Sequence, residues 1–225
     1  MSVIHLGRFL GTDMARAGAV LKRLTPYRKR LIVSIVGILA AVMISWQPLL
    51  LGVAAFMAAS SPLEKADFIL LLYHDSDSIP AGAADLYQRR LAPRVLLYGV
   101  EPSRLEKLGL GPPAHEVWRK LLEARGVPPH AIDTIGSGVS TDRELADAIR
   151  GLAQGRPLRV IVVASSPASR LARNGLRKNL EGSGVELRMH PVRPRNIDAR
   201  AWWRSRAGWI AYFDAYCLWV LRFLR

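Results

Sequence analysis

The sequence contains 33 consecutive residues, 31–63, without Asp, Glu, Lys or Arg. About 20 apolar residues are enough for a helix to cross a bilayer, whereas two spans would need about 40. We therefore expect one transmembrane anchor over residues 31–60, bent or shortened at Pro48 because proline lacks a backbone N–H. A cleaved signal peptide is the alternative, since small residues occur at 58–60, but its apolar region is normally about 7–15 residues long.

Charge is distributed unevenly around this stretch. The net charge is +14, yet residues 64–169 carry 13 charges of each sign. Residues 1–30 carry seven basic side chains against one acidic, and residues 170–225 carry 12 against four. Because cytoplasmic flanks of a membrane span are rich in Lys and Arg, we expect residues 1–30 in the cytoplasm and residues 64–225 as an exported domain. This distribution argues against a nucleic-acid partner, and we expect the lipid bilayer to be one partner.

The exported part alternates short apolar runs with amphipathic stretches. Five runs are predicted as strands, at 68–73, 95–98, 131–134, 160–164 and 185–189. Helices are predicted at 81–90, 114–125, 142–152, 169–181 and 201–224. FILLLY and VIVVA are continuously apolar, as is typical of strands buried on both faces. The pattern predicts an α/β fold, a Rossmann-like three-layer α/β/α sandwich with a mostly parallel five-stranded sheet.

Polar residues follow the predicted third strand. Ligands of such sheets collect at the carboxyl ends of the strands, where helix N-termini offer free N–H groups. Ser140 and Thr141 are therefore candidates for binding an anion, with Glu144 as a candidate catalytic acid or base. The alternative is a capping box, in which Thr141 and Glu144 bond each other's backbone N–H.

Two further loops carry candidate residues. Ser165, Ser166 and Arg170 follow the VIVVA strand and are candidates for binding an anion. The alternative is that the serines are solvated and cap a helix. His74 and Asp75 form a polar cluster after the first strand, which we interpret as a turn rather than a metal site. The usual phosphate-binding, nucleotide-binding and zinc-protease motifs are missing, so the sequence identifies neither a metal site nor a cofactor.

The closing segment is basic and aromatic. It contains six arginines with three tryptophans between them: Arg188, Arg193, Arg195, Arg200, Arg204, Arg206, Trp202, Trp203 and Trp209. This composition suits contact with anionic lipid headgroups, or else forms an ordinary solvated face. The last helix has an apolar stripe, which we expect to pack against the sheet: Trp209, Ile210, Phe213, Cys217, Val220, Leu221 and Leu224.

Several short motifs occur in the order found in a known family. They are ADFILLL at 66–72, AADLY at 83–87, LAPRVLL at 91–97, LLEARGVP at 121–128, STDRE at 140–144, VIVVASS at 160–166 and PV at 191–192. Together they resemble the SanA/ElyC/YdcF-like family, also described as domain of unknown function 218. The resemblance covers about residues 66–220.

The resemblance implies a Rossmann-like domain tethered to the bacterial inner membrane, on the periplasmic side, with a role in envelope and peptidoglycan integrity. The chain departs from the family at polar positions: the family's Gly-Gly is Tyr73-His74, its Arg is missing near Ile79, and Ala168 stands near its His. Binding of an anionic envelope molecule is therefore the first functional expectation. The alternative is a hydrolase or transferase that acts on a lipid-linked or phosphorylated envelope precursor.

Overall fold

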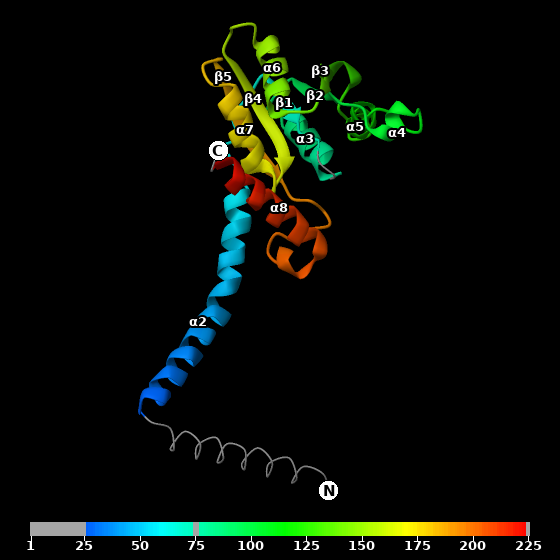
Figure 1. Ribbon diagram of the computed structural model, residues 1–225. Helices are drawn as coiled ribbons and strands as arrows, with labels where there is room; N and C mark the ends of the chain where they lie inside the picture. The colour runs from blue at the N-terminus through cyan, green and yellow to red at the C-terminus, as the bar shows by residue number, and fades with distance from the viewer. Residues whose placement is uncertain (1–25, 74–76, 224–225) are drawn as a thin grey trace. The chain divides into compact units, whose positions relative to one another are not determined.

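The structure, a computed structural model, describes residues 26–73 and 77–223 (Figure 1). Side chains at positions 28, 39–45 and 223 lie outside that description. The chain divides into two compact units, Met1–Leu49 and Leu50–Arg225. The second unit therefore begins earlier than residue 64, where the sequence placed the start of the exported domain.

Helix α2, Pro26–Met57, is 32 residues long and contains Pro48. Its part in the first unit exposes apolar side chains, among them Leu31, Ile38 and Leu49. A search of the described residues finds no helix whose length and apolar character together suffice to cross a membrane. The membrane span thus stays a prediction, and residues 1–25 of the basic N-terminal segment lie outside the described residues.

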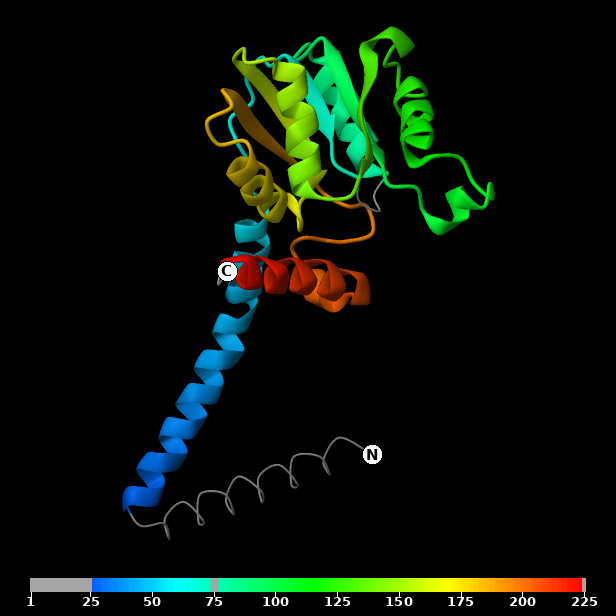
Figure 2. The ribbon, with the colours of Figure 1, turned by 45° about the horizontal axis from the view of Figure 1, so that its top comes forward.

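The second unit is built on five parallel strands in the order β3-β2-β1-β4-β5 (Figure 2). The strands are β1 Phe68–Leu71, β2 Arg94–Val100, β3 Ile132–Val139, β4 Leu158–Ser165 and β5 Val185–Val192. The chain runs from β1 outward to β3 and then returns to the other side of β1. The predicted Rossmann-like α/β fold is confirmed, and the strand order reverses between β1 and β4.

Helices cover both faces of the sheet. Helix α3 (Ser78–Gln88) and helix α5 (Ala114–Glu123) pack on one face, and helix α6 (Asp142–Ala153) and helix α7 (Ser169–Asn179) on the other. Short helical turns, α4 (Arg104–Lys107) and η1 (Pro129–Ala131), lie before and after α5.

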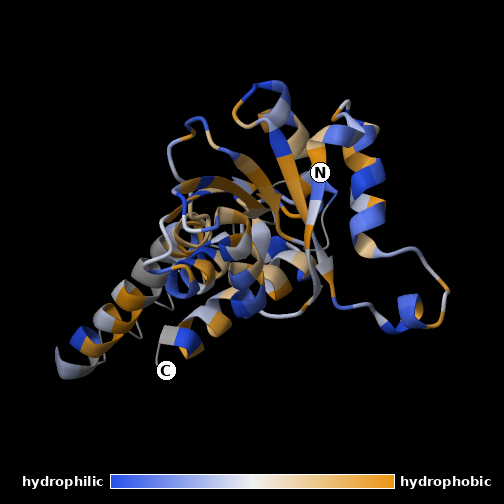
Figure 3. Ribbon diagram, turned by 90° about the horizontal axis from the view of Figure 1, so that it is seen from above, coloured by the Kyte–Doolittle hydropathy of each residue, from blue (hydrophilic) through white to orange (hydrophobic). Residues whose placement is uncertain are grey.

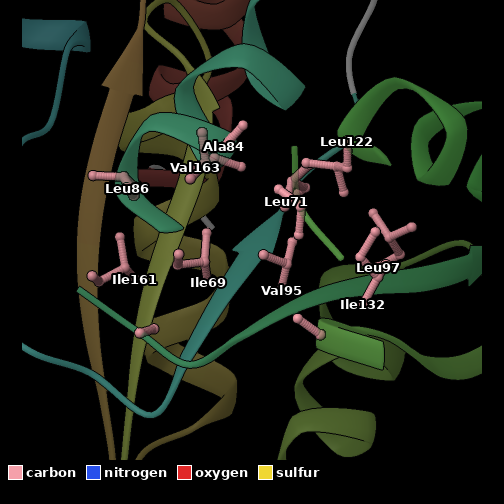
Figure 4. Close-up of a cluster of buried hydrophobic side chains, with 14 of the residues drawn as sticks. Ile69, Leu71, Ala84, Leu86, Val95, Leu97, Leu122, Ile132, Ile161 and Val163 are labelled. Carbon is pink, nitrogen blue, oxygen red and sulfur yellow. The ribbon is translucent and has the colours of Figure 1, made fainter. Parts of the chain in front are cut away.

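Successive side chains of each strand enter opposite faces, as period-2 geometry requires. Ile69 and Leu71 enter the cluster beneath α3 and α5 (Figure 4), whereas Leu70 and Leu72 enter the cluster beneath α6 and α7. The central strands β1, β2 and β4 are accordingly mainly apolar (Figure 3), whereas β3 and β5 at the two edges of the sheet carry more polar residues. This double burial explains why FILLLY and VIVVA are continuous rather than alternating.

The predicted bounds of β2 and β3 were too short. Strand β2 continues to residue 100 and β3 to residue 139, past the predicted ends at 98 and 134. The pairing register shifts between Tyr98 and Val100, which marks an irregularity opposite the glycines of β3. Gly136 has a φ of +63°, and a Cβ there would meet Val139 Cγ2 at 2.8 Å. The strand can therefore continue through this point because residue 136 is glycine.

The last helix begins at Arg206, five residues later than the predicted start at residue 201. A short 3-10 turn, η2 (Trp202–Arg204), precedes helix α8 (Arg206–Phe223). Ser205 is extended and its Oγ accepts a hydrogen bond from Gly208 N at 3.0 Å, as an N-cap residue does. A Cβ on Gly208 would lie 2.1 Å from Trp202 O, so glycine permits this close turn.

The expectation that the stripe of α8 packs against the sheet was also wrong. Trp209, Ile210, Phe213 and Leu221 of that stripe are exposed, and Cys217 is half-buried. The opposite side of α8 is the buried one, and there Tyr212 and Ala215 join a third cluster with Ala54, Met57, Ile197 and Trp202. The periodicity predicted the helix and its apolar face correctly but could not say which face is covered.

Candidate functional site

The carboxyl ends of the strands are the natural place for a site in this fold. The predicted residues occur there in two groups, Ser140 to Glu144 after β3 and Ser165 to Arg170 after β4. In the sheet these strands are separated by β2 and β1, which makes three strand spacings or about 14 Å. The fold therefore keeps the two groups apart where they leave the sheet.

The first group forms a complete capping box at the start of α6. Glu144 Oε2 accepts from Ser140 N at 2.7 Å, from Ser140 Oγ at 3.0 Å and from Thr141 N at 3.1 Å. Thr141 Oγ1 in turn accepts from Glu144 N at 3.2 Å. Hydrogen bonds from Ser140, and then from Thr141, lower the pKa of Glu144. A lowered pKa makes this carboxylate a weaker base, and the N–H groups predicted for an external anion already have a partner.

The second group lies between β4 and α7 and is also engaged within the protein. Ser166 is buried, and both its N (2.8 Å) and its Oγ (3.0 Å) donate to Val192 O. Ser169, which is fully buried, donates from Oγ to Met57 O at 3.0 Å and to Ser166 O at 3.1 Å. These hydroxyls tie α7 to the end of β5 and to the end of α2.

Arg170 contacts the last turn of α2 rather than an open surface. Its Nε donates to Phe56 O, and its guanidinium carbon lies 4.0 Å from the centre of the Phe56 ring. Burial lowers the pKa of Arg170, and the neighbouring Arg173 lowers it further. A cation at the C-terminal end of a helix is favoured by the free carbonyls there, so Arg170 has a structural partner where an anion was predicted.

A cavity of about 410 Å³ lies at the same end of β4, beneath α8. Ser165 and Pro167 line it from the β4–α7 turn, Asn196 and Ile197 from the loop after β5, and Leu218 from α8. Most of the lining is apolar, with Ser165, Asn196 and Asp214 as its polar side chains. Such a lining suits an apolar chain with a polar end better than a compact, highly charged ion.

The loop next to this cavity is basic. Arg193 and Arg195 flank the lining residue Pro194, and both are exposed. Arg188, which the sequence grouped with them, is instead held by Glu64 at 2.9 Å and Glu186 at 2.7 Å. We call Arg193 and Arg195 the rim arginines because they flank the cavity-lining Pro194, and both are exposed to solvent, whereas Arg188 is held in ion pairs.

An aromatic cluster fills the carboxyl ends of β1 and β2. The Tyr73 ring lies 4.6 Å from the Tyr98 ring and 4.5 Å from the Trp118 ring, between centroids. Burial raises the pKa of both tyrosines, so they stay neutral in any ordinary buffer. His74 and Asp75, the predicted polar cluster, follow directly and lie outside the described residues.

The described residues contain no cluster of side chains suited to hold a metal ion. No group of three or more His, Cys, Asp or Glu side chains comes together in residues 26–73 and 77–223.

Of the predicted anion ligands, Ser165 lines the cavity. Asn196, Ile197, Asp214 and Leu218 were missed, because they come from a loop and a helix far along the chain and carry no motif.

Together these features define a Rossmann-like α/β domain with a largely apolar cavity at the carboxyl edge of its sheet. Comparison of the chain with protein-family models, with curated proteins and with solved structures finds no match. The resemblance to the SanA/ElyC/YdcF-like family therefore stays a prediction based on the motifs.

Proposed function

We propose that this chain is a single-pass bacterial inner-membrane protein whose periplasmic α/β domain binds an anionic, lipid-linked envelope component. The anchor lies within residues 31–60 and ends before Leu50, because Leu50–Met57 pack in the second unit, and residues 1–30 are cytoplasmic. This part of the proposal rests on the sequence, in which 33 uncharged residues follow a strongly basic segment. Binding would serve envelope or peptidoglycan biogenesis.

The packing around residue 57 supports an uncleaved anchor. Met57 is fully buried, and its carbonyl accepts from Ser169 Oγ. Trp202 Nε1 donates to Leu50 O at 2.9 Å. Removal of a signal peptide near residues 58–60 would take Met57 out of a cluster that includes Trp202 and Tyr212. The domain thus depends on the residues that cleavage would discard.

The observation that carries the binding proposal is the cavity under α8. Its apolar lining fits a hydrocarbon chain, and the exposed Arg193 and Arg195 at its rim fit a phosphate or carboxylate headgroup. A lipid-linked molecule combines these two chemistries. Because Ser166 and Arg170 are engaged internally, the rim arginines are better placed for the anion than the residues predicted from the sequence.

Binding is tested with the full chain reconstituted in phosphatidylcholine vesicles that contain a fluorescent long-chain polyprenyl phosphate. Leu218→Glu places a charge in the cavity lining, and Arg195→Glu reverses a rim charge, so each should weaken binding at least about tenfold. The matched controls are Leu105→Glu in α4 and Arg156→Glu before β4, both at exposed positions. Equal affinity in test and control variants would refute the cavity as the binding site.

The alternative function is a hydrolase or transferase on such a precursor, with Glu144 as acid or base. It predicts turnover of a reconstituted lipid-linked precursor and loss of that turnover in Glu144→Ala. Binding without turnover supports the first proposal.

Topology has its own test. A reporter enzyme that is active only after export, fused after Arg225, should be active in cells, whereas a fusion at Met1 should be inactive. The reverse pattern would overturn the proposed location and with it the envelope ligand.

A further inference from the structure

Helix α8 carries an outward apolar face that nothing in the described chain covers. Its exposed members are Trp209 (45% exposed), Ile210 (52%), Phe213 (55%), Tyr216 (40%) and Leu221 (59%). On a helix with 3.6 residues per turn these positions form one continuous side, with Cys217 among them. A contiguous patch of large apolar side chains marks an interaction surface.

This outward face lies opposite the side of α8 that packs in the domain and borders the side that lines the cavity. Tyr212 and Ala215 pack into the cluster with Met57 and Trp202, while Ala207, Ala211 and Leu218 line the cavity together with Ile210 at the border. Trp209 Nε1 donates to Trp203 O at 2.8 Å, so its polar atom is satisfied and its exposed part is ring. An indole held in this way suits the boundary between water and hydrocarbon.

Helix α8 lies against the end of α2. Helix α8 crosses the last turns of α2, which belong to the same compact unit (Figure 2). The rings of Phe56 and Trp219 meet edge to face with centroids 4.9 Å apart. Trp202, just before α8, is bonded to Leu50 O. The end of α2 and the start and end of α8 are therefore fixed to each other.

The charge next to α8 has the sign that a bacterial membrane surface attracts. Exposed arginines occur in the loop after β5, in η2 and at the start of α8: Arg195, Arg200, Arg204 and Arg206. Acidic side chains near them are Asp198 and, at the edge of the outward face, Asp214. The excess of arginine favours anionic headgroups, and the apolar side chains favour the hydrocarbon beneath them.

We propose that α8 is an in-plane membrane helix, lying on the outer surface of the bilayer with Trp209, Phe213 and Leu221 inserted at the headgroup boundary. The inference rests on the proposed function, because it takes the end of α2 to be where the anchor leaves the bilayer. It adds a second membrane contact that would hold the mouth of the cavity next to lipid. A lipid-linked ligand would then reach the cavity without crossing open water.

Cys217 permits a direct test, since it is the single cysteine and belongs to the outward face. The full chain, labelled there with a fluorophore, is reconstituted in vesicles of phosphatidylethanolamine and phosphatidylglycerol that contain doxyl-labelled lipid. Reference labels are placed, in a Cys217→Ser background, by Ile38→Cys in α2 and Glu181→Cys at the opposite edge of the sheet. We expect strong lipid quenching at 217 and at 38, and none at 181.

The outcomes separate the two proposals. Quenching at 38, with 217 no more quenched than 181, overturns the in-plane helix and leaves the anchor. Absence of quenching at 38 overturns the anchor and the inference with it. Self-quenching at 217 that grows with protein density, without lipid quenching, shows that a second copy covers the face and also overturns the inference.

Two variants sharpen the assignment. Phe213→Glu should reduce lipid quenching of the label at 217, whereas Leu105→Glu, at an exposed position in α4, should leave it unchanged. Equal effects of the two substitutions would contradict the assignment of the outward face. Replacement of phosphatidylglycerol by phosphatidylcholine should reduce quenching at 217 but not at 38, and equal quenching in both lipids would refute the role of the arginines.

Discussion

The apolar residues of the sheet and those of α8 are chemically alike but lie in opposite surroundings. Leu70 and Leu71 of β1 are fully buried because helices cover both faces of the sheet. Leu221 of α8 is 59% exposed although it belongs to an equally apolar segment. Apolar composition thus predicts that these side chains are removed from water. The partner that covers them is protein in the sheet and, by our proposal, lipid on α8.

The largest expected effect is on stability, where a substitution in the sheet should cost much more than one on the outward face of α8. Leu70→Ala should lower the free energy of unfolding by about 2–5 kcal/mol, because it leaves a cavity in a close-packed core. Leu221→Ala should change it by less than about 0.5 kcal/mol in detergent, where no bilayer contact is made. Denaturant titration of the full chain in the same detergent measures the free energy of unfolding of both variants. Similar losses would contradict the difference between the sheet and α8.

A smaller effect probes the cluster that joins the end of α2 to α8. Trp202→Phe keeps most of the ring but removes the N–H that donates to Leu50 O. We expect a loss of about 1 kcal/mol and faster proteolysis within residues 58–65. Trp46→Phe, in the first unit, is the comparison variant. Unchanged proteolysis of Trp202→Phe would mean that this bond does not hold the end of α2 in the domain.

The start of α6 provides a third measurement, within the sheet domain itself. Thr141→Ala removes the hydroxyl that accepts from Glu144 N, and loss of such a cap costs about 1 kcal/mol. Thr134→Ala in β3 is the comparison, since it also removes an accepting hydroxyl, here an exposed bond from Arg119 at 3.1 Å, but outside any helix cap. If both variants unfold at the same denaturant concentration as the unchanged protein, the capping box contributes nothing measurable.

The smallest effect depends on pH. Hydrogen bonds lower the pKa of Glu144 in the folded state, so its contribution is fully present above the unfolded-state pKa and is lost as the pH falls through the folded-state pKa. From about pH 5 downward, the unchanged protein should lose stability faster than Glu144→Gln. Thermal unfolding at a series of pH values tests this, and parallel curves for the two proteins would contradict it.

The layer arrangement followed from local patterns. FILLLY and VIVVA are continuously apolar, which predicted strands buried on both faces, and β1 and β4 are buried in this way. The order of the strands in the sheet was not predicted, because it depends on pairing between distant segments. STDRE predicted the capping box because its bonds lie within five residues of one another. Predictions that depended on distant partners failed, since nothing near Arg170 in the sequence indicates that Phe56 is its partner.

In the candidate site, too, a residue within a local pattern was predicted and residues from distant segments were missed. Ser165 was predicted because it follows a buried strand, and it lines the cavity. Asn196 and Asp214 also line it, yet they belong to segments that carry no motif. A cavity wall made of single residues from several elements leaves no spacing for a sequence pattern to reveal.

The sequence by itself determined the alternation of strands and helices, the uncharged segment and the basic ends, because each depends on neighbours in the chain or on composition. Tertiary structure alone decided that the end of α2 belongs to the second unit and that α8 turns its most apolar stripe outward. The physical reason is that periodicity defines a face of a helix, while the packing of distant elements decides which face is covered. Here Met57 and Trp202 occupy the side of α8 that carries Tyr212 and Ala215, and the stripe is left for another partner.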